Sequence, residues 1–321
     1  MISNDASTKE VDKMAMSMKN ILFSLLFVLF YTGCQSTDEK REYAPQYSEK
    51  PSFAMNHVYI FGVHPLHNPA RLFEVYGPMI DYINERLEGS ELRLEASRDY
   101  PQFDKKLFSG HFDFALPNSY QTVIAADNGY RIFGKMGDDA NFRGIILVRK
   151  DSKIRTFEDL KGKTVSYPAP TALAATMMPQ RYFYDRGIDI NKDIINQYVG
   201  SQESAIMNVY LGKSDAACTW PPPWRAFIKE RPEIAQKVMI KWETPPLVNN
   251  GLVVQNNVPD ALVKQVSEII FSLHTHEEGR KILRSMELSK YEKADHTSYD
   301  PVRVFLKNFE NEIRPIRGKN D

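Results

Sequence analysis

Cysteine is scarce in this chain, with Cys34 and Cys218 the two examples among 321 residues. Two cysteines can form one disulfide at most, so the sequence excludes the disulfide-rich scaffolds of small secreted proteins. No grouping of cysteine and histidine has the spacing of a structural zinc site, and His64 and His67 lack a third ligand nearby. We therefore expect neither a metal nor another cofactor, and we expect Cys218 to be a small buried residue.

An excess of charge of either sign is also missing. Lysine and arginine together number 41, and aspartate and glutamate together also number 41, so the formal net charge is zero. Proteins that bind nucleic acid usually present a basic stripe to the phosphates. The composition therefore predicts no nucleic-acid partner, and only local groups of charge can guide a ligand.

Long hydrophobic runs are absent as well. The apolar stretch at residues 21–31 has eleven residues, whereas a membrane-spanning helix needs about 20. It follows Lys19 and precedes Gly33 and Cys34, a pattern typical of an export signal whose cysteine is lipidated. An N-terminal core helix is the alternative, but the stretch has no amphipathic period. We predict a lipoprotein signal peptide at 1–33, and a protein anchored to the membrane through Cys34 in the periplasm.

After the signal, the chain passes from a polar segment to a pattern of alternating elements. Residues 34–54 carry Pro45 and Pro51 with little to bury, which indicates a flexible tether. From residue 55 onward, short apolar runs alternate with stretches of helical period. Alternation of this kind predicts an α/β fold with mainly parallel sheets flanked by helices, and ligands at the carboxyl ends of the strands. Strands are expected at 58–63, 92–96, 112–116, 143–149, 164–167, 194–199, 215–218, 238–242 and 251–255.

Several short motifs, in order along the chain, resemble one known family. They are FGVHP at 61–65, FDFALPNSY at 112–120, ILVRKDS at 146–152, FEDLKGK at 157–163 and GSQ at 200–202. Their order and spacing resemble the two-lobed, type II periplasmic binding proteins that serve the import of phosphate, phosphite and phosphonate. The resemblance implies two α/β lobes joined by two crossing strands, which close over a ligand in the cleft. The crossings are expected near 149–150 and 244–249, so that lobe one comprises 55–149 and 250–321 and lobe two comprises 150–249.

The loops that follow the first and third predicted strands supply binding candidates from lobe one. His64 lies just after the strand at 58–63, where its imidazole can donate a hydrogen bond to a ligand. Asn118 and Ser119 begin a helix, and unpaired N–H groups in a first helical turn favour an anion. Tyr120 can point into the cleft. The same residues also suit a helix cap and a core tyrosine.

Lobe two and the expected crossings supply the remaining candidates. Thr171 and Ala172 begin an alanine-rich helix, where a hydroxyl and the backbone can approach a ligand. Family members have Tyr-x-Ser where this chain has Phe142 and Arg143 before Gly144, and Gly-Ser-His where it has Gln202 after Ser201. Arg143 can bind an anion through its guanidinium or lie in solvent, and Gln202 offers a donor and an acceptor.

The run WPPPW at 220–224 adds an aromatic wall. If its prolines form an extended left-handed helix, rising about 3.1 Å per residue, the two indoles face different sides. We expect Trp220 near the cleft and Trp224 in the core.

Together these features predict a membrane-tethered solute-binding protein with no catalytic activity. The resemblance implies a small anionic ligand, such as phosphonate, phosphate or phosphite, delivered to an ABC permease. A lipoprotein that senses its ligand for a membrane signalling partner is the alternative. A hydrolase is a weaker alternative, because neither Ser119 nor Ser201 lies in a Gly-x-Ser-x-Gly turn.

Overall fold

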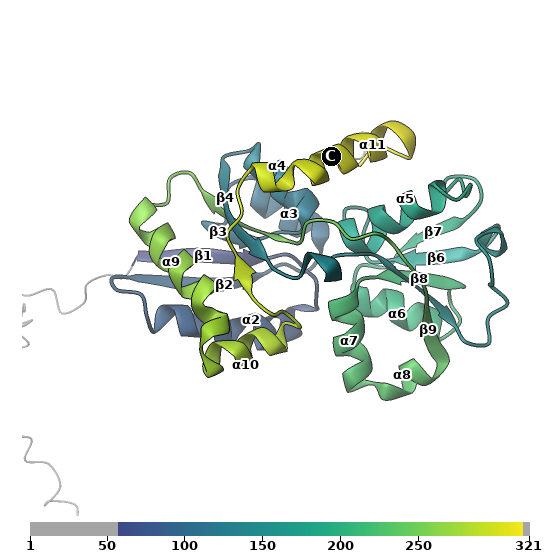
Figure 1. Ribbon diagram of the computed structural model, residues 1–321, viewed down its shortest axis with the longest axis horizontal. Coiled ribbons are helices and arrows are strands. Elements are labelled where there is room, and N and C mark those ends of the chain that lie inside the picture. The colour runs from purple at the N-terminus through teal and green to yellow at the C-terminus, as the bar shows by residue number, and fades with distance from the viewer. Residues whose placement is uncertain (1–56, 317–321) are drawn as a thin grey trace, which may run out of the picture. The chain divides into compact units, whose positions relative to one another are not determined.

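The computed structural model describes residues 57–316, whose arrangement is shown in Figure 1. The predicted signal peptide, its Cys34 and the tether lie outside these residues. Within the described part of the chain, no helix has both the length and the hydropathy needed to cross a bilayer. The same part holds no group of three or more histidine, cysteine or acidic side chains placed to bind a metal.

Lobe one is built around a six-stranded sheet in the order β11-β4-β10-β3-β1-β2. Its N-terminal elements are β1 (His57–Val63), α2 (Pro69–Asn84), β2 (Ser90–Ala96), α3 (Tyr100–Phe108), β3 (Phe114–Leu116), α4 (Ser119–Ala126) and β4 (Tyr130–Met136). The chain returns later to add β10 (Gly251–Gln255), α9 (Asp260–Ser272), α10 (Glu277–Ser285), β11 (Tyr291–Glu292) and α11 (Asp300–Glu312). Gly77 and Pro78 lie inside α2, which continues through them as one helix with seven buried side chains.

Lobe two is built around a five-stranded sheet in the order β7-β6-β8-β5-β9. Its elements are β5 (Ile145–Arg149), β6 (Thr164–Tyr167), a π-helical turn (Leu173–Met177), α5 (Met178–Tyr184), β7 (Ile195–Tyr198), α6 (Gln202–Tyr210), β8 (Ala216–Thr219), α7 (Pro221–Glu230), α8 (Pro232–Lys237) and β9 (Val238–Glu243). In the described chain as a whole, short 3₁₀ turns lie at Asp139–Asn141, Glu158–Leu160, Leu273–Thr275 and Thr297–Tyr299.

Both sheets are mixed. In lobe one, β1 pairs in parallel with β2 and β3, whereas β10 runs antiparallel to β3 and β4. In lobe two, β6 pairs in parallel with β7 and β8, and β5 runs antiparallel to β8 and β9. The reversed strands β5 and β10 each enter their sheet directly from the other lobe, and the short β11, antiparallel to β4, is also reversed. The parallel strands of each sheet have their carboxyl ends on the side that faces the other lobe, as expected for an α/β fold.

The first connection between the lobes differs from the expected one near 149–150. The strand Ile145–Arg149 pairs with β8 and β9 in the second sheet, so the chain crosses at 137–144. The prediction missed β4, the last strand before the crossing. The second connection runs through 244–250, between β9 and β10.

The two connections are hydrogen-bonded to each other. The N–H of Thr244 donates to the Gly144 carbonyl oxygen, and the N–H of Gly144 donates to Thr244 Oγ1, both at 2.9 Å. Further along, the N–H of Leu247 donates to the Phe142 carbonyl oxygen at 2.9 Å. The crossing is therefore a paired ribbon, which can act as a hinge while the lobes stay rigid.

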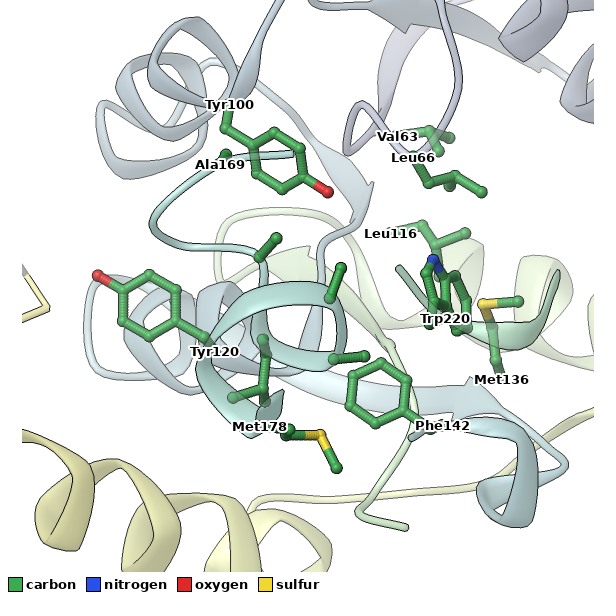
Figure 2. Packing of buried hydrophobic residues seen from close by; sticks show 14 of the residues in the cluster. Val63, Leu66, Tyr100, Leu116, Tyr120, Met136, Phe142, Ala169, Met178 and Trp220 are labelled. Atoms are coloured by element: carbon green, nitrogen blue, oxygen red, sulfur yellow. The ribbon is translucent and has the colours of Figure 1, made fainter. Parts of the chain in front are cut away.

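One hydrophobic cluster contains residues of both lobes. Figure 2 shows Leu116 from lobe one, Trp220 from lobe two and Phe142 from the first connection in this cluster. Cys218 is fully buried in the same cluster, which confirms its predicted role. Apolar packing therefore continues across the interface between the lobes.

Candidate functional site

A small cavity lies between the lobes, where the strand ends meet. The volume that the centre of a water molecule can occupy in it is about 10 Å³, which is enough for about one water molecule. No carboxylate or cationic side chain contributes to its wall. The lining residues are His64, Tyr100, Asn118 and Asn250 from lobe one, and Phe142, Ala172, Leu173, Ala174, Ala175, Gln202 and Trp220 from the first connection and lobe two.

His64 forms part of the lobe-one wall directly after β1. Its Nδ1 lies 2.9 Å from the carbonyl oxygen of Leu116, and a carbonyl only accepts, so Nδ1 carries the proton. Burial lowers the pKa of His64 to about 4, against a smaller opposing effect of that hydrogen bond, and nearby His67 lowers it further. The imidazole is therefore neutral at pH 7, and its Nε2 is a hydrogen-bond acceptor.

His67, the second histidine of this loop, faces lobe two and does not line the cavity. Its Nδ1 lies 3.7 Å from an oxygen of Glu203 in α6. It therefore contributes to contact between the lobes.

Asn118 connects the cavity wall of lobe one to that of lobe two. Its Oδ1 accepts from the N–H of Gln121 at 3.0 Å, and the Gln121 side chain accepts from the N–H of Asn118, which completes a capping box on α4. Because Oδ1 is engaged at the cap, Nδ2 faces outward and donates to the Thr171 carbonyl oxygen at 3.1 Å. One side chain thus begins a helix in lobe one and holds a loop of lobe two.

The lobe-two wall is formed by the backbone that leads into the π-helical turn. Three carbonyl oxygens of this backbone accept hydrogen bonds. Those of Ala169 and Ala172 accept from the hydroxyl and the N–H of Thr176, both at 2.8 Å. That of Thr171 accepts from Asn118. The first N–H groups of a helix have no acceptor within it. Since Ala174 and Ala175 are small, the backbone can approach a bound group closely.

Gln202 and Tyr100 face each other across the interface. Gln202 is the first residue of α6, and its Oε1 accepts from Thr219 Oγ1 at 2.7 Å. This contact leaves the Nε2 donors of Gln202 for other groups. Burial raises the pKa of the Tyr100 hydroxyl, against a smaller effect of its hydrogen bond with Gln202, so Tyr100 stays neutral at physiological pH.

Trp220 and Phe142 form the aromatic side of the cavity. Their rings meet edge to face, with centroids 5.7 Å apart. The prolines that follow Trp220 do not form the extended left-handed helix considered as one possibility above. Residues 221–223 form the first turn of α7, where proline is tolerated because the N–H groups would lack acceptors anyway. Trp224 is buried in a separate lobe-two cluster, as expected.

Four predicted residues do not line the cavity. Ser119 is fully buried and donates its hydroxyl to the Val248 carbonyl oxygen at 2.7 Å, and Tyr120 is buried in the core cluster. Arg143 forms an ion pair with Glu243 at 2.8 Å. Thr171 contributes its carbonyl oxygen to Asn118 rather than a hydroxyl to the cavity. The side chains of Ser119 and Arg143 are thus engaged by partners that are remote in sequence.

Other lining residues were not predicted. Tyr100 follows β2 and begins α3, so the rule that ligands lie at strand carboxyl ends would have found it. Asn250 ends the second connection, and no local pattern marks it. Its buried Oδ1 has no partner among the described residues. The cavity therefore combines donors, such as Gln202, with at least two acceptors, His64 Nε2 and Asn250 Oδ1.

Comparison with known proteins places this chain in a family. A family model described as "ABC transporter, phosphonate, periplasmic substrate-binding protein" matches residues 61–299. A probable ABC transporter phosphite binding protein, PhnD1 of Prochlorococcus marinus strain MIT 9301, is 22% identical over 189 residues. That match covers 55% of this chain and 63% of the relative, so the chain spans less than two thirds of the length of that relative.

Solved structures show the same fold. A binding protein component of an ABC phosphonate transporter from Pseudomonas aeruginosa superposes with a TM-score of 0.73 at 20% identity, covering 80% of this chain and 87% of that chain. PhnD1 from P. marinus in complex with methylphosphonate superposes with a TM-score of 0.71 at 18% identity, covering 80% and 99%. The predicted two-lobed type II fold is thus confirmed. From the match over residues 61–299, the chain belongs to the family of periplasmic substrate-binding proteins of phosphonate ABC transporters.

Proposed function

We propose that this protein binds a small tetrahedral oxyanion of the phosphonate, phosphite or phosphate class between its lobes, without chemical turnover. The observation that carries the proposal is the cavity itself, in which neutral donors and acceptors from both lobes converge. Helix N-termini and amide donors suit an anion. A tetrahedral oxyanion needs several times the room of one water, so the lobes must separate to admit it and close again around it.

The acceptors in the cavity favour a ligand that carries a proton. His64 Nε2 and Asn250 Oδ1 can each accept from a P–OH group, and no cationic side chain contributes to the wall. A fully ionised oxyanion would leave both acceptors without donors, which costs free energy in a buried site. We therefore infer a preference for the singly charged form of the ligand. Affinity should fall as the pH rises through the second pKa of the ligand.

A ligand panel tests this proposal. Thermal shift and calorimetry with methylphosphonate, phosphite, phosphate, a sulfonate and a carboxylate should show stabilisation by the phosphorus oxyanions. A ligand at 100 times its Kd adds about 2.7 kcal/mol to the free energy of unfolding. Stabilisation by neutral or cationic compounds alone would contradict the proposal.

A matched pair of variants locates the site. Gln202→Glu replaces a lining amide by a carboxylate, whereas Gln265→Glu makes the same change at an exposed position of α9. We expect Gln202→Glu to weaken oxyanion binding at least about tenfold, because a donor becomes a like charge. Gln265→Glu should bind as the wild type does. Equal affinities in the two variants would place the ligand elsewhere.

We further propose that the protein is tethered by lipid at Cys34 and delivers its ligand to an ABC permease. The lipid is supported by the apolar run at 21–31 followed by Gly33 and Cys34, and the permease by the family description. Cys34→Ser should move the protein from the membrane fraction to the soluble periplasm, and Cys218→Ser should not. Uptake of labelled phosphonate should require the chain. Unchanged fractionation of Cys34→Ser would refute the lipid anchor.

A further inference from the structure

The C-terminal helix is a third link between the lobes. At its start, Tyr299 donates its hydroxyl to the Asn249 carbonyl oxygen at 2.6 Å, and Arg303 lies 3.6 Å from Asp127 of lobe one. At its end, Glu312 pairs with Arg181 of α5 at 2.8 Å. Figure 1 shows α11 running from beside α4 toward α5. The described end of the segment predicted for lobe one therefore also contacts lobe two.

Arg314, just beyond this helix, inserts its side chain into lobe two. Its Nε donates to Gln180 Oε1 at 2.9 Å, and its Nη2 donates to the Pro170 carbonyl oxygen at 2.8 Å. The neighbouring Arg181 has two carboxylate partners, Asp185 and Glu312. Arg314, in contrast, forms no ion pair with any described carboxylate. The groups that accept hydrogen bonds from the Arg314 guanidinium are therefore neutral.

The contact at Pro170 lies next to the cavity wall. Thr171 follows, and its carbonyl oxygen accepts from Asn118; Ala172, the next residue, lines the cavity. The carbonyl oxygens of residues 170 and 171 are therefore held by Arg314 and Asn118, both of which reach lobe two from lobe-one elements. Burial lowers the pKa of Arg314, but arginine remains charged in proteins.

We propose that Arg314 is a positioning residue for the anion site, which fixes the loop at 168–172 and supplies the positive charge that the cavity wall lacks. This inference rests on the proposed oxyanion function. Through Arg314, the C-terminal strap, defined as α11 and residues 313–316, couples lobe closure to the shape of this loop. Because the Arg314 guanidinium has no carboxylate partner among the described residues, its positive charge remains available to attract a bound anion. Its half-buried position limits the screening of this attraction by salt.

The test compares Arg314→Gln and Arg314→Lys with a control, Arg303→Gln, which lies within α11. The control also removes one positive charge but contacts lobe one. Methylphosphonate affinity is measured by calorimetry. We expect Arg314→Gln to bind about tenfold more weakly or worse, as for loss of a charge-assisted contact. Arg314→Lys should recover most of the affinity because it keeps the charge, and Arg303→Gln should bind like the wild type.

A second readout requires no ligand. Amide hydrogen exchange in the ligand-free variants should be faster at 171–177 in Arg314→Gln than in the wild type, with α6 unchanged. If wild-type protein binds no phosphorus oxyanion, the proposed function fails, while faster exchange would still support the positioning of the loop. Wild-type affinity in Arg314→Gln, or affinity equally reduced in Arg314→Lys and Arg314→Gln, would overturn the charge role. Unchanged exchange at 171–177 would overturn the positioning role.

Discussion

Replacing Asn118 by aspartate should separate the structural role of this residue from its role in closure. The carboxylate can still accept from the N–H of Gln121, which is 3.0 Å from Oδ1 in the wild type, and a negative charge is favourable at a helix N-terminus. The free energy of unfolding should therefore change by about 1 kcal/mol or less. The donor to the Thr171 carbonyl oxygen, in contrast, is lost.

The expected effect on binding is much larger. Leaving the Thr171 carbonyl oxygen unpaired in the closed state costs about 1 to 3 kcal/mol. A carboxylate about 5 Å from a bound anion adds about 3 kcal/mol of repulsion at an effective dielectric constant of about 20. Since each 1.4 kcal/mol is a factor of about ten, methylphosphonate should bind about a thousandfold to ten-thousandfold more weakly to Asn118→Asp.

Calorimetry at neutral pH and urea unfolding measure the two quantities separately. Asn128→Asp is the matched control, because Asn128 also donates its amide to a carbonyl oxygen of α4, that of Ile124 at 2.6 Å, but does not line the cavity. It should bind the ligand as the wild type does. Binding by Asn118→Asp within about threefold of this control, at equal stability, would refute the assigned role of Asn118.

Three further outcomes follow from the geometry. His64 has a folded-state pKa of about 4 against an ordinary value of 6.5, so the unfolded state binds its proton first as the pH falls. The free energy of unfolding should therefore decrease below about pH 6.5, by about 2 kcal/mol at pH 5. His64→Gln should flatten this decrease in urea unfolding. Lys135 is 9% exposed beside two carboxylates at 2.8 and 2.6 Å, so Lys135→Met should lower the free energy of unfolding by about 1 to 2 kcal/mol; an unchanged urea midpoint would count against this. A Cβ on Gly144 would lie 2.6 Å from the Ala174 carbonyl oxygen, so Gly144→Ala should lower Tm and weaken ligand binding together, because the clash displaces the cavity wall.

Local patterns were sufficient for most of the elements and failed for β4. The strand YRIFGKM at 130–136 is interrupted by Arg131, Gly134 and Lys135, which conceals its apolar character. Lys135 can be buried there because Asp139 and Glu292 pair with it. Glu292 is contributed by β11, more than 150 residues further along the chain. Missing this strand also placed the first crossing too late.

The candidate site divides in the same way. Helix starts and strand ends are local features, so His64, Asn118 and Gln202 could be selected from sequence, and all three line the cavity. The charge of Arg143 makes it a predicted site residue, but that charge is engaged by Glu243, 100 residues away. Tyr100 follows a predicted strand but is not among the predicted site residues, and no local pattern marks Asn250.

The α/β class, the helix start at Asn118 and the family could be predicted from the sequence, because they depend on periodicity and short motifs. Tertiary structure alone decided which polar groups face the cavity and which are taken by distant partners. Hydrogen bonds and ion pairs act over a few ångströms in space, irrespective of separation along the chain. For this reason the contact between Arg314 and Pro170, which lie 144 residues apart in the chain, exists only in the folded protein.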